Sequence, residues 1–261
     1  MQSEPKEQTA LATRKMSDAQ PDPVRRLAKY VVDSGLAPAP LPEEYRYASL
    51  PLCIIDVVFS IGVGYNTTAA TVARFCERTG WPQLLPSRPG RGTGSHTIDQ
   101  FLDLLGGATA EQVADRHFGN RQRTSTTSGI LKAEAVRLFA AALAEAGIVS
   151  YVDLTPERVE LAEAMILGLP GQGSGIAFDY FRMLAGNDDL IKPDRMVQRF
   201  VAGALCLRAD PTPRQTALLV RLAAKDLRAR GHAWSPLTLD HAIWRHQSGR
   251  DGSAAGAGNM R

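Results

Sequence analysis

Apolar residues recur at intervals of three and four positions along most of the chain, and strand-like alternation of apolar and polar residues is almost absent. This spacing predicts amphipathic helices, with clear examples at 24–31, 131–143 and 159–169. Thr155-Pro156-Glu157 offers an N-cap, a first-turn proline and an early acid, which together mark a helix start. Glycines such as Gly147 mark helix ends. The pattern predicts an all-α protein.

The segment 50–65, LPLCIIDVVFSIGVGY, is apolar on almost every face. It therefore predicts a central buried helix. The segment carries one charged residue, Asp56. A carboxylate in the core must be paired, neutral or functional, because burying an isolated charge is costly. The alternative is that Asp56 caps or bonds a backbone group at the edge of the core.

Three stretches do not fit the helical pattern. Residues 1–22 are polar and contain prolines, and residues 248–261 are rich in Gly, Ala and Ser, so we expect both to be disordered tails. The Pro- and Gly-rich stretch 81–96 predicts an irregular excursion between helices. The helical domain is therefore expected at 23–247.

Size, composition and cysteine spacing narrow the class of protein. The chain has 261 residues, is 44% hydrophobic and 22% charged, and has no apolar run long enough for a membrane span. Its polar start lacks the apolar core of a secretory signal. Cys53, Cys76 and Cys206 form no zinc or disulfide pattern. These features predict a cytoplasmic protein that does not bind membranes.

The net charge of +3 is unevenly distributed. Residues 191–230 contain nine Lys or Arg and three Asp, a net charge of +6, and the remainder of the chain carries −3. A basic segment of this kind is typical of a nucleic-acid-binding face, although solvated helix faces also carry such charge.

The most informative stretch is 156–186, where two predicted helices flank the tight turn LPGQGSG. Gly171 and Gly173 allow a sharp turn and close backbone approach. The free amides at the start of the second helix favour an anion, so this helix–hairpin–helix is suited to gripping a DNA phosphate. An ordinary helix–helix turn uses the same glycines.

Nineteen residues after Gly175 comes Asp194, in the run KPDRMV that leads into another amphipathic helix. This arrangement resembles the helix–hairpin–helix DNA glycosylase superfamily, in which an LPGxG hairpin and a helix precede a catalytic aspartate. The run LKAEA at 131–135 and the apolar helix at 50–65 are similar to segments of that family. The resemblance covers about 45–245 and is most specific at 165–200. It implies a two-lobed helical fold with the active cleft between the lobes.

The chain also departs from the family pattern. Gly175 occupies the position of the Schiff-base lysine of bifunctional members, so the resemblance implies a monofunctional enzyme that uses water as the nucleophile. The iron–sulfur cysteine quartet is absent, and a monovalent cation at the hairpin is the one cofactor that the resemblance suggests. Ile61 or Gly62 replaces the usual wedge glutamine. Asp56 falls near the catalytic glutamate of the adenine-excising branch and is a candidate to protonate the leaving base.

The resemblance assigns the remaining roles. Asp194 would stabilise the cationic sugar and orient or deprotonate water. A flipped base needs a pocket or wedge, for which Phe59, Ile61 and Tyr65 are candidates, with plain core packing as the alternative for each. The candidate DNA-binding residues are Leu169, Gly171, Gln172, Gly173, Ser174, Gly175, Lys192 and Arg195.

The sequence thus predicts a monomeric, monofunctional DNA N-glycosylase that contacts mainly the phosphate backbone of double-stranded DNA. The excised base would be a damaged base in DNA repair, or a bulky modified base in defence against foreign DNA. The alternative is a non-catalytic helix–hairpin–helix DNA-binding module.

Overall fold

The computed structural model describes residues 22–87, 92 and 94–249, and this part of the chain is helical, as predicted. Its only β-type pairings are two isolated bridges, Tyr47 with Leu84 and Arg123 with Leu131. The α-helices are α2 (Pro23–Asp33), α3 (Leu50–Phe59), α4 (Tyr65–Thr79), α5 (Ile98–Leu105), α6 (Ala110–Val113), α7 (Lys132–Glu145), α8 (Pro156–Leu167), α9 (Ile176–Leu184), α10 (Arg195–Leu205), α11 (Pro213–Ala229) and α12 (Pro236–Gln247). Three shorter helical turns are η1 (Glu43–Arg46), η2 (Ala114–Phe118) and η3 (Tyr151–Asp153).

The predicted helix start at 155–157 is confirmed. Thr155 is the N-cap of α8, its hydroxyl accepts from the Arg158 amide, and Pro156 occupies the first helical position. Thr97, Thr109, Thr212 and Ser235 form reciprocal capping boxes at the starts of α5, α6, α11 and α12. Helix boundaries in this chain are therefore specified largely by local side-chain to backbone hydrogen bonds.

The apolar helix is buried as predicted but is shorter than expected. All ten residues of α3 are buried. The helix ends at Phe59, whereas the sequence pattern suggested that it continues to 65, where Tyr65 instead begins α4. Gly62 adopts a φ of +70°, in the left-handed region, which interrupts the helix where glycine has no steric penalty.

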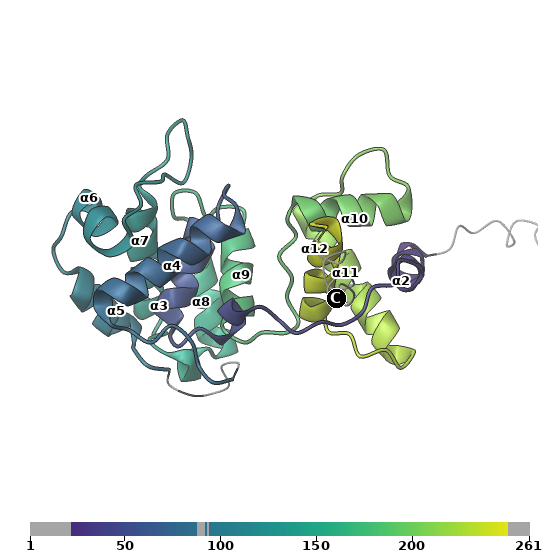
Figure 1. Ribbon diagram of the computed structural model, residues 1–261, viewed down its shortest axis with the longest axis horizontal. Helices are drawn as coiled ribbons and strands as arrows, with labels where there is room; N and C mark the ends of the chain where they lie inside the picture. The colour runs from purple at the N-terminus through teal and green to yellow at the C-terminus, as the bar shows by residue number, and fades with distance from the viewer. Residues whose placement is uncertain (1–21, 88–91, 93, 250–261) are drawn as a thin grey trace, which may run out of the picture.

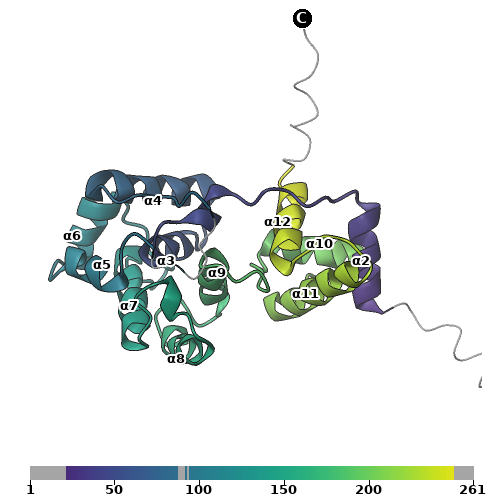
Figure 2. The same cartoon turned by 90° about the horizontal axis from the view of Figure 1, so that it is seen from below.

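The helices form two groups, each with its own hydrophobic cluster (Figures 1 and 2). The larger group contains α3 to α9, and its cluster also includes Leu237 from α12. The smaller group contains α2, α10, α11 and α12. Two segments of the chain, 34–49 and 185–194, cross between the groups (Figure 1). Segment 34–49 carries η1, which contacts α9.

The irregular stretch 81–96 contains no helix in its described part, as expected, and Trp81 stacks on His96 there with ring centroids 3.9 Å apart. Most of the two expected tails, 1–21 and 250–261, lies outside the described residues. Among the described helices, none is both long and apolar enough to cross a membrane.

A buried lysine holds the end of α3. Lys132, at the start of α7, is only 1% exposed, and its Nζ donates to the carbonyl oxygens of Phe59 (2.9 Å) and Ile61 (2.8 Å) and to Oε1 of Gln122 (3.2 Å). These carbonyls lie at the C-terminal end of α3, where a positive charge is favoured by the helix dipole. Burial lowers the pKa of Lys132 to about 8.

We expect Lys132→Met to lower the free energy of unfolding by about 2 to 4 kcal/mol, because it leaves buried acceptors without a donor. Urea denaturation followed by circular dichroism measures the change. The control is Lys29→Met, which removes an exposed i,i+4 ion pair with Asp33 and should change stability by less than about 0.5 kcal/mol. Equal losses in the two variants would mean that Lys132 does not hold α3.

Candidate functional site

The turn between α8 and α9 has the geometry of a tight hairpin. Gly171 and Gly175 have φ values of +81° and +74°, which favour glycine at both positions. A Cβ on Gly171 would lie 2.9 Å from Cβ of Thr124, in the segment before α7. Gly173, in contrast, lies outside the left-handed region, and the nearest atom to an added Cβ is the Leu167 oxygen at 3.7 Å.

The hairpin presents unused backbone donors to solvent. Gly171, Gly173 and Ser174 are exposed, and their amides donate to no acceptor within the described part of the chain. Gly175, the N-cap of α9, has no side chain that could accept a hydrogen bond. The first amide of the helix, on Ile176, donates to Oγ of Ser174 at 3.4 Å. Outward amides at a helix N-terminus favour a bound anion.

Two residues predicted to bind DNA from this hairpin lie further inside. Leu169 is half-buried, and Gln172 is 1% exposed. Neither amide atom of the Gln172 side chain has a hydrogen-bond partner among the described residues. Its backbone amide donates to the Leu169 oxygen at 3.0 Å. In this conformation the Gln172 side chain does not reach the surface.

Asp194 is the N-cap of α10. Its Oδ1 accepts from the amides of Met196 (2.8 Å) and Val197 (3.1 Å), while its Oδ2 accepts no hydrogen bond from any described residue. Because one oxygen satisfies both helix amides, the other is available to a ligand. Asp194 is half-buried, and the next residue, Arg195, is exposed.

Lys192 lies at the centre of an acidic cluster between the two helix groups. Its Nζ lies 3.7 Å from the centroid of the Tyr180 ring on α9 and 3.3 Å from Oγ of Ser60 at the end of α3. Its backbone amide is 3.5 Å from Oδ2 of Asp240 on α12. Burial lowers the pKa of Lys192, and the charges of Glu44, Asp56, Asp194 and Asp240 oppose that shift.

Asp56 is paired inside the core, one of the states expected for it. It is 2% exposed, and the Tyr47 hydroxyl donates to its Oδ2 at 2.8 Å. A second hydrogen bond comes from Tyr180, and Lys192 supplies an opposite charge. Burial raises the pKa of Asp56, whereas Lys192 and the two tyrosines oppose the rise. The alternative of a carboxylate bonded to backbone is not what the structure shows.

Two acids of this cluster were not predicted from the sequence. Asp240 is 5% exposed, its Oδ1 has no partner among the described residues, and burial raises its pKa. Glu44 is 7% exposed, and Tyr65 donates to its Oε2 at 3.0 Å. Glu44 lies 12 residues before Asp56, and Asp240 lies 48 residues after Lys192, so no local helical spacing indicates the cluster. In the described part of the chain, no group of three or more His, Cys, Asp or Glu could hold a metal ion.

The three candidates for a base pocket or wedge differ in exposure. Phe59 is completely buried against Phe118, with ring centroids 5.1 Å apart, as the core-packing alternative predicts. Ile61 is half-buried, and its carbonyl is held by Lys132. Tyr65 is 40% exposed at the start of α4.

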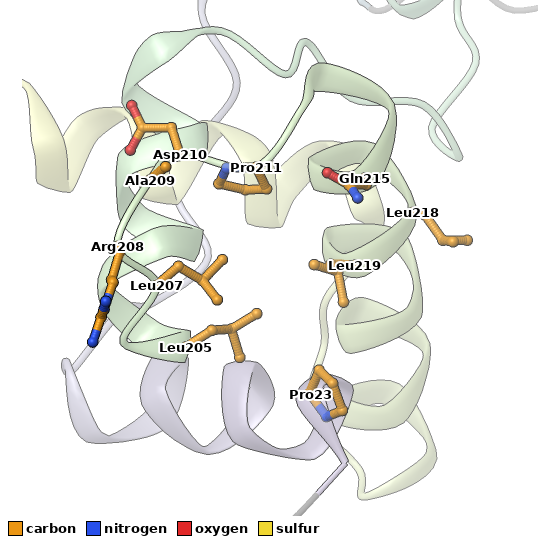
Figure 3. Close-up of a pocket in the computed structure, with 10 residues that line it drawn as sticks. All are labelled: Pro23, Leu205, Leu207, Arg208, Ala209, Asp210, Pro211, Gln215, Leu218 and Leu219. Atoms are coloured by element: carbon orange, nitrogen blue, oxygen red, sulfur yellow. The ribbon is translucent and has the colours of Figure 1, made fainter.

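The basic segment 191–230 lies on the smaller group. Apart from Lys192, its cationic residues are exposed: Arg195, Arg199, Arg208, Arg214, Arg221, Lys225, Arg228 and Arg230. The same group contains an open groove of about 580 Å³ between α2, α10 and α11 (Figure 3). No predicted site residue lines this groove.

A family model described as "Domain of unknown function (DUF8548)" matches residues 25–248. Comparison with curated proteins and with solved structures found no match.

Proposed function

The chain belongs to the DUF8548 family, and we propose that it is a monofunctional DNA N-glycosylase with a helix–hairpin–helix fold and an active cleft between its two helix groups. It would flip out a damaged or modified base of double-stranded DNA and hydrolyse the N-glycosidic bond, leaving an abasic site. We also propose that the protein acts as a monomer in the cytoplasm. Its role would be in DNA repair or in defence against modified foreign DNA. The monovalent cation at the hairpin stays a prediction.

The position of Asp194 carries the proposal. Asp194 ends the segment that crosses between the groups, two residues after Lys192, whose ammonium lies against α3 and α9. Its Oδ2 is available while Oδ1 caps α10. A carboxylate held in this way would stabilise positive charge on the sugar without needing to reorganise, and would accept a proton from the attacking water.

Two surfaces of the protein support binding to the phosphate backbone of DNA. The exposed amides of Gly171, Gly173 and Ser174 would bind one phosphate of the duplex. The exposed basic residues of α10 and α11 add a charge that attracts DNA independently of its sequence. These two surfaces supply affinity, whereas the choice of base would depend on the acidic cluster and its surroundings.

The cap geometry also favours the second candidate function, a non-catalytic DNA-binding module. A capping role alone accounts for the two hydrogen bonds of Asp194 Oδ1. In such a module the charge of Asp194 has no chemical task. A substitution that keeps the cap and removes the charge therefore separates the two functions.

We expect Asp194→Asn to reduce single-turnover base excision by on the order of a hundredfold or more, because the lost charge acts in the transition state. DNA affinity should hold or rise slightly, since one negative charge beside phosphates is removed. The assay measures abasic-site formation in a panel of duplexes, each with one modified base, together with binding of the same duplexes.

Asp22→Asn is the control, because Asp22 is also a helix N-cap: it caps α2 and accepts from the Val24 amide at 3.0 Å. Asn caps a helix nearly as well as Asp, so both variants should keep wild-type stability. Wild-type excision by Asp194→Asn would reduce Asp194 to a cap and favour the binding module. Absence of abasic sites with every duplex would count against the glycosylase itself.

Because water is the proposed nucleophile, borohydride should trap no covalent protein–DNA adduct, and product strands should stay intact until alkali is added. Gel electrophoresis after reduction measures both. Among the described residues, Lys192 is the lysine that lies close to the acids of the cluster. An adduct that Lys192→Met abolishes would identify an amine nucleophile and overturn the monofunctional mechanism.

We expect Gly173→Asp to lower duplex affinity about tenfold or more for all sequences alike, because it puts a negative charge at the proposed phosphate grip. Fluorescence anisotropy across a series of salt concentrations measures this, and wild-type affinity should fall steeply with salt. Gly173→Ala is the control, since an added Cβ has space there, whereas Gly171→Ala would collide with Thr124. Affinity that is flat in salt and unchanged in Gly173→Asp would place the DNA-binding surface elsewhere.

A further inference from the structure

Glu44 is a buried acid outside every predicted site. It lies on η1, in the segment 34–49 that crosses between the helix groups, and is 7% exposed. Its neighbour Glu43 is exposed and pairs with Arg46. Among the described residues, no ion pair includes Glu44. Two adjacent glutamates therefore have opposite environments.

The groups around Glu44 act on its pKa in opposite directions: burial and Asp56 raise it, whereas its backbone hydrogen bond, the Tyr65 hydroxyl and Lys192 lower it. Asp56 on α3 is a like charge, and Lys192 is the nearby cation. Ionisable hydroxyls also lie near it, from Tyr47 in the same segment, Tyr180 on α9 and Tyr65 on α4. Burial is the largest influence and raises the pKa of Glu44 to about 7. Near neutral pH a large fraction of Glu44 is thus a carboxylic acid, which is the form able to donate a proton.

Tyr65 connects this acid to the surface. Its hydroxyl is 3.0 Å from Oε2 of Glu44, while its side chain is 40% exposed. Its ring centroid is 6.5 Å from that of Trp244 on α12, so the aromatic ring that contacts Glu44 also lies near a ring of the other helix group. Aromatic side chains are the usual stacking partners of an extruded base.

We propose that Glu44 is the general acid that protonates the leaving base, directly or through the Tyr65 hydroxyl, and that the substrate is a neutral base rather than an alkylated cation. This inference rests on the proposed glycosylase function. A base that already carries a positive charge leaves as a neutral molecule and needs no acid. A neutral base would leave as an anion unless a proton reaches it.

Glu44 gives its proton to a ring nitrogen or exocyclic oxygen of the base, and the electron pair of the sugar–base bond moves to the base. Water adds to the cationic sugar carbon, and Asp194 accepts the proton that the water loses. Asp194 releases that proton to solvent and Glu44 takes one up, so the net reaction consumes one water.

Asp56, the acid suggested by the sequence, is placed less well for this role. It is 2% exposed, hydrogen-bonded to two tyrosines and close to Lys192. Those partners stabilise its carboxylate form and keep it from the surface. Asp56 is better placed as a neighbour that positions Lys192.

The experiment compares wild type with Glu44→Gln, Tyr65→Phe and the control Glu43→Gln. Single-turnover excision is measured from pH 5 to 9 on duplexes containing hypoxanthine, 8-oxoguanine, uracil or 5-hydroxymethylcytosine, and on one containing 7-methylguanine, a cation. Glu44→Gln should slow excision of the neutral substrate about 10² to 10⁴-fold and remove the decline in rate above about pH 7. Tyr65→Phe should have a smaller effect, and Glu43→Gln none.

Duplex affinity and thermal stability are measured for each variant, and Tyr65→Phe keeps the test informative if Glu44→Gln does not fold. Glu44→Gln could keep the wild-type rate and pH profile while Asp194→Asn loses most of its excision activity. This result would overturn the role of Glu44 and leave the proposed glycosylase function standing. Preference of the wild type for 7-methylguanine would also overturn the role of Glu44. Failure of the wild type to release any base would instead remove the proposed function, and this inference with it.

Discussion

The ammonium of Lys192 is the interaction on which the junction between the two helix groups depends. It lies on the Tyr180 ring, reaches the end of α3 through Ser60, and belongs to the segment that leads into α10. A partly buried cation is stabilised by nearby opposite charges, and here these come from η1, α3, α10 and α12. The same electrostatic requirement therefore joins the groups and concentrates their acids in one place.

The acids around Lys192 lie in different environments. Glu44, Asp56 and Asp240 are buried, and burial raises the pKa of each, so a single lysine does not hold all three as carboxylates. Asp194 differs because two helix amides bind its carboxylate and leave one oxygen available. Acid–base chemistry on a single substrate needs acids in such different environments.

The sequence predicted the features that local patterns determine. Thr155 and Pro156 start α8 as expected, and the glycine-rich turn after α8 is a hairpin, because caps and turns depend on neighbouring residues. The end of α3 was placed too late, since hydrophobicity continues past Phe59 while Gly62 adopts a left-handed conformation. The environments of Glu44, Lys132 and Asp240 could not be predicted, because contacts with residues far along the chain create them. No periodicity encodes such contacts.

The hairpin glycines and the buried acids differ in what they indicate about function. Gly171 is required by its φ of +81° and by contact with Thr124, so any tight helix–helix turn of this shape would keep it. The hairpin motif therefore fits a binding module and an enzyme equally well. The acidic cluster does not, because burying Glu44, Asp56 and Asp240 beside one cation costs stability. Acids, protonated or ionised, also do not attract the phosphates that a binding module must bind. Groups that are costly to the fold and unfavourable for binding are typical of sites where chemistry uses them. The acids between the helix groups, rather than the hairpin, are thus the physical argument for an enzyme.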